Sequence, residues 1–389
     1  MSNPNTFRSA LSKSSSINEL VDELCSTIVQ PNAMPDPPSV AILFVSPGRS
    51  DAFAEICQRL NDQLRPAHLL GCTGEAIVGG AEEIENDECV SLWLAWLPDA
   101  DLQSMHLNYE RSPDGGTFSG WSPTFLQETW PDDVTLLTLG EPYSFPADVF
   151  LERINDDRPG VRVVGGMAGG YGPGDARIVV NNEVYDSGAA VLAIRGVPLT
   201  TVVSQGCRPI GEPFVITKAE RNEILELGGH PAHVQLKAVY DRLPNRDKDL
   251  MRLGIHIGRV VDEYKDAFEY GDFLIRHVTG MNQEAQSILV GDYFRPGQTV
   301  QFHVRDATTA SEDLQQMLGT CSDPVKAGLL FTCNGRGTRL FPHPNHDAGM
   351  IKEKFGDIPN AGFFCQGELG PVSGKNFLHG FTASMALFH

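Results

Sequence analysis

The sequence predicts a mixed α/β fold made of repeated strand-helix-strand units. Two stretches, beginning at Phe44 and Phe331, share F-x-x-x-G-R after an apolar strand and then C-x-G-E after one helix. A stretch between them repeats the order of strand, helix and glycine-rich turn without those polar residues. The strands of all three are near-continuous runs of Val, Ile, Leu and Phe, which is typical of strands covered on both faces. Self-similarity on this scale indicates one copied supersecondary unit.

The first copy begins with an apolar strand at residues 41–45, followed by the loop 46–50. The next segment is an amphipathic helix, and its apolar stripe is expected to pack on a sheet. A second loop at 71–75 (GCTGE) and a strand at 89–97 complete the copy. The residues on the helix stripe are Phe53, Ile56, Cys57, Leu60 and Leu64.

The second and third copies follow the same order. The second has strands at 134–139 and 188–195 with the turn 165–170 between them, and the third has a strand at 328–332 and the loop 333–337. Asn345 or His346 can cap the third helix, 347–355, which Gly356 ends. The loop 365–368 and a strand at 381–388 follow. We expect the strands 41–45, 134–139 and 328–332 to be central in their sheets, and Cys72 and Cys365 to be equivalent.

The remaining segments complete two packed domains. Residues 16–19 form a capping box that starts a helix ending near Val29, and residues 31–38 form a linker. Residues 216–243 are expected to hold one or two helices. Residues 273–305 read as short strands joined by turns such as 295–297, and so as a β-rich insertion in the second domain. The expected divisions are an N-terminal segment at 1–37 and domains at 38–234 and 235–389.

The composition of the chain limits the kinds of partner and the cellular compartment that we expect. The net charge of -20 argues against nucleic acid and anionic membranes, since both reward a basic face. No apolar run approaches the ~20 residues that a membrane span needs, and residues 1–16 lack the apolar core of a secretory signal. The eight cysteines show no C-x-x-C pair, which fits a reduced cytosol. We therefore expect a cytoplasmic protein.

Two loops carry the same two charges, Arg49 with Glu75 and Arg336 with Glu368. Glycine-containing loops at strand ends are where α/β proteins bind ligands. A guanidinium grips a carboxylate with two hydrogen bonds and a carboxylate holds an ammonium, so the pair suits a zwitterion such as an amino acid. The alternative is that each arginine pairs with its own glutamate as an internal turn contact. The expected ligand-binding residues are Arg49, Cys72, Thr73, Glu75, Cys333, Asn334, Arg336, Gly337, Cys365 and Glu368.

Other polar motifs carry weaker signals. Cys72, Cys333 and Cys365 lie in glycine loops beside charges that can activate a thiol, although most free cysteines are small buried hydrophobes. Residues 343–347 (HPNHD) contain residue types that bind metals, but an exposed turn is the better interpretation, and no metal site is expected. Residues 169–175 lack phosphate-loop spacing and are expected to form a hairpin or tight turn.

At these residues the chain resembles the FIST sensory-domain proteins of prokaryotes and eukaryotes. Residues 7–12, 44–50, 70–75 and 165–166 are similar to the FIST N-terminal domain, and residues 330–337, 362–374 and 379–382 to the FIST C-terminal domain. The resemblance covers nearly the whole chain, with the first domain at 38–234 and the second at 235–389. It implies a cytoplasmic sensory module for small molecules such as amino acids. Some relatives are haem proteins that respond to nitric oxide.

The expected function is therefore small-ligand sensing and signal transduction, by a binding protein rather than an enzyme and without a cofactor. One alternative is an enzyme that uses Cys333 or Cys365 as its nucleophile. Another is a haem sensor, whose axial ligand would be His256, His277 or His303. Because no kinase, cyclase or receiver is recognisable, the signal is expected to pass through a separate signalling protein or through a change of oligomeric state.

Overall fold

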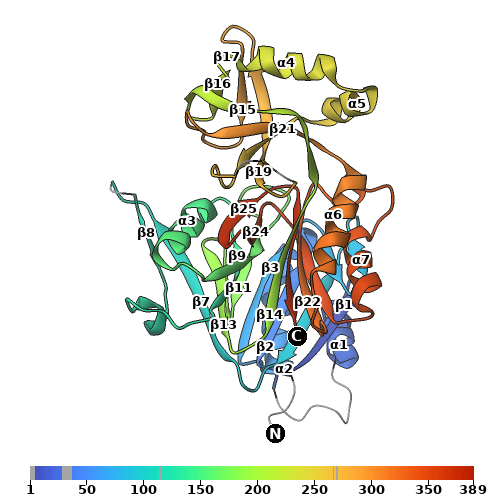
Figure 1. Cartoon of the computed structure of the whole chain (residues 1–389). Helices are drawn as coiled ribbons and strands as arrows, with labels where there is room; N and C mark the ends of the chain where they lie inside the picture. Colours follow the sequence, from blue (N-terminus) through green and yellow to red (C-terminus); the bar gives the residue numbers. More distant parts are fainter. Residues whose placement is uncertain (1–4, 29–36, 114, 266, 269) are drawn as a thin grey trace. The chain divides into compact units, whose positions relative to one another are not determined.

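A computed structural model of the chain describes residues 5–28, 37–113, 115–265, 267–268 and 270–389 (Figure 1). Most of the linker expected at 31–38, and the predicted helix end at Val29, lie outside these residues. The chain forms two compact units. Unit 1 comprises Met1–Val203, Gln315–Leu378 and Thr382–His389, and unit 2 comprises Ser204–Leu314 and His379–Phe381.

Unit 1 is built from three repeats of one pattern. Repeat one consists of β1 (Thr6–Ser12), α1 (Ile17–Ile28), β2 (Val40–Val45), η1 (Pro47–Ala52), α2 (Phe53–Leu64), β3 (His68–Thr73), β4 (Ile77–Gly79), β5 (Glu82–Ile84) and β6 (Val90–Trp96). Repeat two consists of β7 (Asp101–Glu110), β8 (Thr117–Ser119), η2 (Pro123–Leu126), β9 (Thr135–Gly140), α3 (Ala147–Asp157), β10 (Arg162–Met167), β11 (Ile178–Val180), β12 (Glu183–Tyr185) and β13 (Ala189–Arg195). Repeat three consists of β14 (Leu199–Gln205), α6 (Ala307–Gly319), β22 (Ala327–Cys333), η3 (Gly337–Arg339), α7 (His346–Phe355), β23 (Asn360–Cys365), β24 (Glu368–Val372), β25 (Lys375–His379) and β26 (Thr382–Phe388).

Four strands of each repeat lie side by side in one sheet, in the same order. The three sheets contain β1-β6-β2-β3, β7-β13-β9-β10 and β14-β26-β22-β23. The strands β2, β9 and β22 are therefore central, as predicted, and a helix follows each of them. Within each repeat the central strand runs parallel to the strand after its helix and antiparallel to the last strand. The mixed α/β fold with repeated units is confirmed.

A cyclic exchange of hairpins joins the three repeats. The hairpin β4–β5 of repeat one pairs with β23 of repeat three, where Ile77 lies opposite Phe363. The hairpin β11–β12 of repeat two pairs with β3 of repeat one, and β24–β25 of repeat three pairs with β10 of repeat two. Each sheet is thus completed by a hairpin from another repeat, so no sheet of unit 1 is complete without a second repeat.

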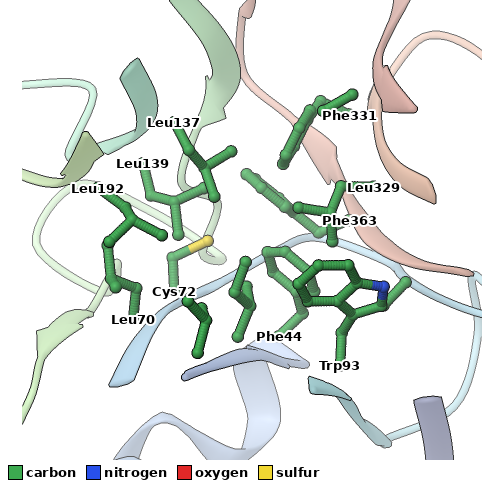
Figure 2. Packing of buried hydrophobic residues seen from close by; sticks show 14 of the residues in the cluster. Phe44, Leu70, Cys72, Trp93, Leu137, Leu139, Leu192, Leu329, Phe331 and Phe363 are labelled. Carbon is green, nitrogen blue, oxygen red and sulfur yellow. The ribbon is translucent and has the colours of Figure 1, made fainter. Parts of the chain in front are cut away.

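The three sheets turn their inner faces toward one apolar core. Phe44 of β2 stacks on Phe363 of β23, with ring centres 5.2 Å apart, and Phe331 of β22 meets both rings edge-on (Figure 2). Leu137 and Leu139 of β9 complete the same cluster. The outer faces are covered by helices. Every residue on the predicted stripe of α2 is buried, in a cluster that also contains α1, while α3 covers the sheet of repeat two.

Strand register separates two cysteines that the sequence equates. Phe44 lies opposite Cys72, whereas Phe331 lies opposite Phe363, and Cys365 lies opposite Cys333. Relative to F-x-x-x-G-R, Cys365 is therefore two residues, or about 7 Å, farther along its strand. The predicted equivalence of Cys72 and Cys365 is wrong. The position of each cysteine is set by the register in which its strand pairs with the central strand, and not by the shared C-x-G-E motif.

Unit 2 is a closed β-barrel inserted between β14 and α6. Its strands follow the order β15-β21-β18-β19-β20-β16, and β16 pairs again with β15. The elements are β15 (Cys207–Glu220), β16 (Glu223–Leu227), β17 (His230–Pro231), α4 (Ala232–Arg242), α5 (Asn245–Leu253), β18 (His256–Val260), β19 (Phe273–Asn282), β20 (Ser287–Val290) and β21 (Thr299–Arg305).

The barrel confirms the β-rich insertion but corrects one expectation. Residues 216–243, expected to hold one or two helices, contain α4, but this helix begins only at Ala232 and the residues before it form strands and turns. Arg221 adopts a left-handed conformation with φ 55°, as do Gly228 and Gly229, and these residues turn the chain at either end of β16. Core side chains of β15 and β16 pack in the barrel interior, and this nonlocal packing stabilises them as strands. The expected boundary at 234/235 falls within α4, and that division stays a prediction.

Candidate functional site

The expected site residues lie in unit 1, at or just after the carboxyl ends of β2, β3, β22 and β23. Gly169 donates its N–H to the Thr73 carbonyl at 2.9 Å. A Cβ on Gly166 would lie 2.2 Å from the Cys365 sulfur, and one on Gly74 would lie 2.5 Å from Phe363. The glycines therefore let three backbones cross closely. The turn at 172–175 closes on its own backbone, as expected for a tight turn.

Most of the expected contact residues lie in the interior. Cys72, Thr73 and Cys365 are fully buried. Burial raises the pKa of both thiols well above its ordinary value, and the Glu368 charge adds to the rise at Cys365. The Thr73 hydroxyl accepts the N–H of Arg177 at 3.0 Å. These side chains therefore pack where the three backbone segments cross and do not face solvent.

Arg336 is fully buried and is held by an acid that the motif comparison did not select. Its Nε and Nη2 donate to the two oxygens of Asp347 at 2.7 and 2.8 Å, a bidentate pair. Thr332 donates to Asp347 as well, at 2.7 Å. The guanidinium carbon lies 5.2 Å from the ring centre of Phe341. Burial opposes ionisation of Asp347, but the neighbouring Arg336 charge holds its pKa below the ordinary value. The bidentate partner of Arg336 is therefore Asp347 and not Glu368, the partner in the alternative interpretation.

Arg49 also has partners other than the expected one. It is 8% exposed, donates Nη2 to the Ser14 carbonyl at 2.6 Å, and has its Nε 3.8 Å from Glu88. Arg49 therefore anchors the segment before α1 and does not pair with Glu75. Gly337 adopts φ +56°, and a Cβ there would lie 2.7 Å from the Phe364 ring, so its place in the loop is a backbone requirement.

Glu368 is fully buried at the start of β24. Its Oε2 accepts the N–H and the hydroxyl of Thr382, at 3.1 and 2.9 Å. Burial raises the pKa of Glu368 to about 8, although hydrogen bonds from Thr382 and Cys333 and the Arg336 charge act against the rise. Burial, with the charge of Asp347, raises the pKa of Glu83 in the same way. Both carboxyls can therefore carry a proton near neutral pH.

Around these buried residues, four residues in or beside the loops after β3 and β22 are at least partly exposed to solvent. We call Glu75, Cys333, Asn334 and Arg339 the loop rim. Arg339 forms an ion pair with Glu75 and donates Nη1 to the Asn334 carbonyl at 2.9 Å. The Asn334 Oδ1 is buried without a hydrogen-bond partner among the described residues. Arg339 was missed by the sequence comparison because it lies outside the copied motif. Its position three residues after Arg336, at the end of η3, was the available signal.

The three histidines expected as haem ligands lie side by side in the barrel. His256 lies opposite His303 on β21 and His277 on β19. His256 and His303 are 1% exposed and packed against Phe381 and Phe273, with ring centres 4.3 and 4.9 Å apart. Burial lowers the pKa of His256 to about 3 and of His303 to about 4. Only His277 of the three is exposed, so His256 and His303, as packed, do not offer an accessible axial ligand.

Comparison with known families agrees with this architecture. Residues 39–230 match the FIST N domain, and residues 236–371 match the FIST C domain. The chain belongs to the FIST family. FIST domains are regarded as sensory and signalling modules. Among the described residues of this FIST protein, no helix is both long and apolar enough to cross a membrane.

Two mycobacterial proteins are similar to this FIST protein along most of its length. The uncharacterized protein MT0656 of Mycobacterium tuberculosis (strain CDC 1551 / Oshkosh) is 41% identical over 356 residues, which is 90% of this chain and 91% of that protein. The uncharacterized protein Mb0898c of Mycobacterium bovis (strain ATCC BAA-935 / AF2122/97) is 40% identical over 356 residues, 90% of each. The shared region therefore contains both FIST domains.

Proposed function

We propose that this FIST protein is a sensory module that binds a small zwitterion, such as an amino acid, at the loop rim. One observation supports the proposal most directly. Opposite charges, Arg339 and Glu75, lie beside a buried Asn334 oxygen that has no hydrogen-bond partner among the described residues. The ligand carboxylate would take the guanidinium of Arg339. Its ammonium would take Glu75 and the Asn334 Oδ1.

The resting ion pair does not prevent this exchange. The side chains of Arg339 and Glu75 are 59% and 30% exposed, and pairs this exposed contribute only ~0–1 kcal/mol. A ligand that satisfies both charges and also the Asn334 oxygen gains more than the pair loses. The fully buried Arg336 and Glu368 then act as supports of the loop.

The same contacts supply a route for the signal. Arg339 and Thr338 belong to repeat three, whereas Glu75 and Glu85 belong to repeat one. Thr338 donates its N–H and hydroxyl to Glu85, at 3.0 and 2.6 Å, beside the Arg339–Glu75 pair. A ligand that separates the pair changes a contact between repeats. We expect a separate signalling protein to read this change.

A thermal-shift screen of amino acids would first identify the ligand. Replacing Arg339 by Gln should then lower the affinity for that amino acid at least tenfold. A charged hydrogen-bond partner contributes about 1.5–3 kcal/mol, and Gln keeps polar hydrogen-bonding atoms but not the charge. Arg339→Lys should weaken binding less, since it keeps the charge and loses the bidentate geometry. Isothermal titration calorimetry measures both.

The matched control is Arg252→Gln in the barrel. Arg252 is 64% exposed and forms a similar surface pair with Asp249, so its loss should leave affinity unchanged. Glu75→Gln should weaken binding as Arg339→Gln does. If Arg339→Gln and Glu75→Gln both bind with wild-type affinity, the loop rim is not the site.

A second candidate function, a cysteine-dependent enzyme, is supported at Cys333 alone. Cys333 is half-buried and hydrogen-bonded to Glu368, whose raised pKa suits it to exchange a proton with a thiol. The other expected nucleophile, Cys365, is buried, and its pKa is raised well above the ordinary value.

Iodoacetamide at neutral pH should therefore alkylate Cys333 first, while Cys72 and Cys365 stay unmodified in the folded protein. Peptide mass spectrometry over time gives the rate at each cysteine. Cys321 is a suitable internal control, because it is also half-buried and burial raises its pKa. Labelling of Cys321 as fast as Cys333 would remove the support for this second function.

A further inference from the structure

A small cavity in repeat two is lined by aromatic rings and two arginines. It lies beside the end of α3 and has a volume of about 180 Å³. None of the loop-rim residues lines it. The rings that line it are Phe118, Trp121, Phe125, Trp130 and Phe150.

The rings form a fixed wall. Phe118, Phe125 and Phe150 are 8%, 4% and 1% exposed. Trp121 lies 5.1 Å from Trp130 between ring centres, and 6.1 Å from Phe150 in a stacked arrangement. Trp121 and Trp130 are only half-buried, so parts of their surfaces stay available. Such a wall suits a flat aromatic ligand, because rings pair in offset and edge-to-face arrangements.

The two arginines give the cavity a positive side. The guanidinium of Arg153 lies 5.5 Å from the Phe118 ring centre and that of Arg158 lies 5.1 Å from the Trp130 ring centre. Arg153 donates Nη2 to the Gly116 carbonyl at 2.7 Å. Asp157, which is exposed, also lines the cavity, so the three charges leave a net charge of +1.

One donor of this group lacks an acceptor. Arg158 donates Nη1 to the Asp157 carbonyl at 2.8 Å and Nη2 to the Gln127 carbonyl at 3.4 Å. Its Nε is buried without a hydrogen-bond partner among the described residues. A buried charged donor left without an acceptor is costly, and an anion in the cavity would supply one.

We propose that this cavity binds a small aromatic monocarboxylate. The ring would lie against Trp121 and Trp130, and the carboxylate would take the Nε of Arg158 and the guanidinium of Arg153. A cavity of about 150 Å³ accommodates benzene, so 180 Å³ suits one ring with a carboxylate. The net charge of +1 matches a monoanion rather than a dianion.

Benzoate titrated into the full-length protein tests the proposal, with benzamide and cyclohexanecarboxylate as probes of charge and aromaticity. Benzoate should bind saturably and change the fluorescence of Trp121 and Trp130. Benzamide, which is uncharged, should bind at least tenfold more weakly, and cyclohexanecarboxylate should also be weaker. Equal binding of benzoate and benzamide, or no saturable binding of benzoate, would overturn the proposal.

Arg158→Met should lower benzoate affinity at least tenfold and leave benzamide unchanged. Arg153→Met is the second variant in case Arg158→Met does not fold. Arg195→Met is the control, because Arg195 is 35% exposed in the same sheet, pairs with Asp101 and does not line the cavity. Arg339→Gln should not alter benzoate binding, which separates this test from that of the loop rim. Wild-type benzoate affinity in both Arg153 and Arg158 variants would refute the assignment.

Discussion

Replacing Asp347 by Ala is expected to lower the free energy of unfolding of unit 1 by about 3–5 kcal/mol, because removing one partner of a buried ion pair leaves the other charge unpaired. Asp347 and Arg336 are 1% and 0% exposed. The change also removes the acceptor of the Thr332 hydroxyl. Urea denaturation followed by tryptophan fluorescence measures the effect. All four tryptophans lie in unit 1, so the signal reports on that unit.

The control for this variant is Asp101→Ala. Asp101 pairs with Arg195 at 2.8 Å, but the two side chains are 49% and 35% exposed, so its loss should cost less than ~1 kcal/mol. The double variant Arg336→Met with Asp347→Leu should recover much of the stability, because apolar groups often replace a buried pair without loss. An Asp347→Ala protein as stable as the control would contradict the structural role.

A second variant, Arg336→Lys, tests the expectation that Arg336 binds a ligand, through its stability and its affinity. Arg336→Lys cannot reproduce two parallel hydrogen bonds to Asp347. If Arg336 is a support, this variant should unfold more easily and keep its affinity for the screened amino acid. Lower affinity at unchanged stability would instead return Arg336 to the binding site.

Replacing Glu368 by Gln should remove much of the pH dependence of stability between about pH 4.5 and pH 8. The folded-state pKa of Glu368 is about 8, against an ordinary value of 4.5. The folded state therefore keeps a proton that the unfolded state releases within this window. The contribution of Glu368 to the free energy of unfolding should fall as pH rises through the window, by on the order of 5 kcal/mol, since each unit of pKa is worth about 1.4 kcal/mol.

The sign follows from the number of bound protons. Below pH 4.5 both states hold the proton and the contribution of Glu368 is fully present, and above about pH 8 it is lost. The glutamine side chain of the Glu368→Gln variant does not titrate, so the variant should be more stable than the wild type at pH 8. Arg336, Cys333 and Cys365 are the charged or titratable groups around Glu368, and Arg336 keeps its charge throughout.

Urea denaturation at several pH values gives the two curves. The carboxyl of Glu83 also has a raised pKa, so a smaller slope should remain in Glu368→Gln. A Glu368→Gln protein with the full wild-type slope would show that Glu368 is ionised in the folded state at neutral pH.

Local patterns in the sequence predicted the elements around the site well. The α2 stripe is visible because helical periodicity places Phe53, Ile56 and Leu60 on one face. The central strands are visible because strands buried on both faces lose the alternation of polar and apolar residues. One or two helices were expected within residues 216–243, and α4 lies there, but only pairing with distant strands makes the residues before it part of a barrel.

The sequence by itself determined the copied unit, the order of its elements, the family and the loops that meet near the site. Only the tertiary structure decided which charges in those loops are buried and which reach solvent. Arg336 and Arg339 lie three residues apart in one loop, yet Arg336 is fully buried and the side chain of Arg339 is 59% exposed. The reason is physical. Burial of Arg336 depends on Asp347 from α7 and on packing against a hairpin from another repeat, β4–β5. Neither contact can be read from the residues of the loop itself.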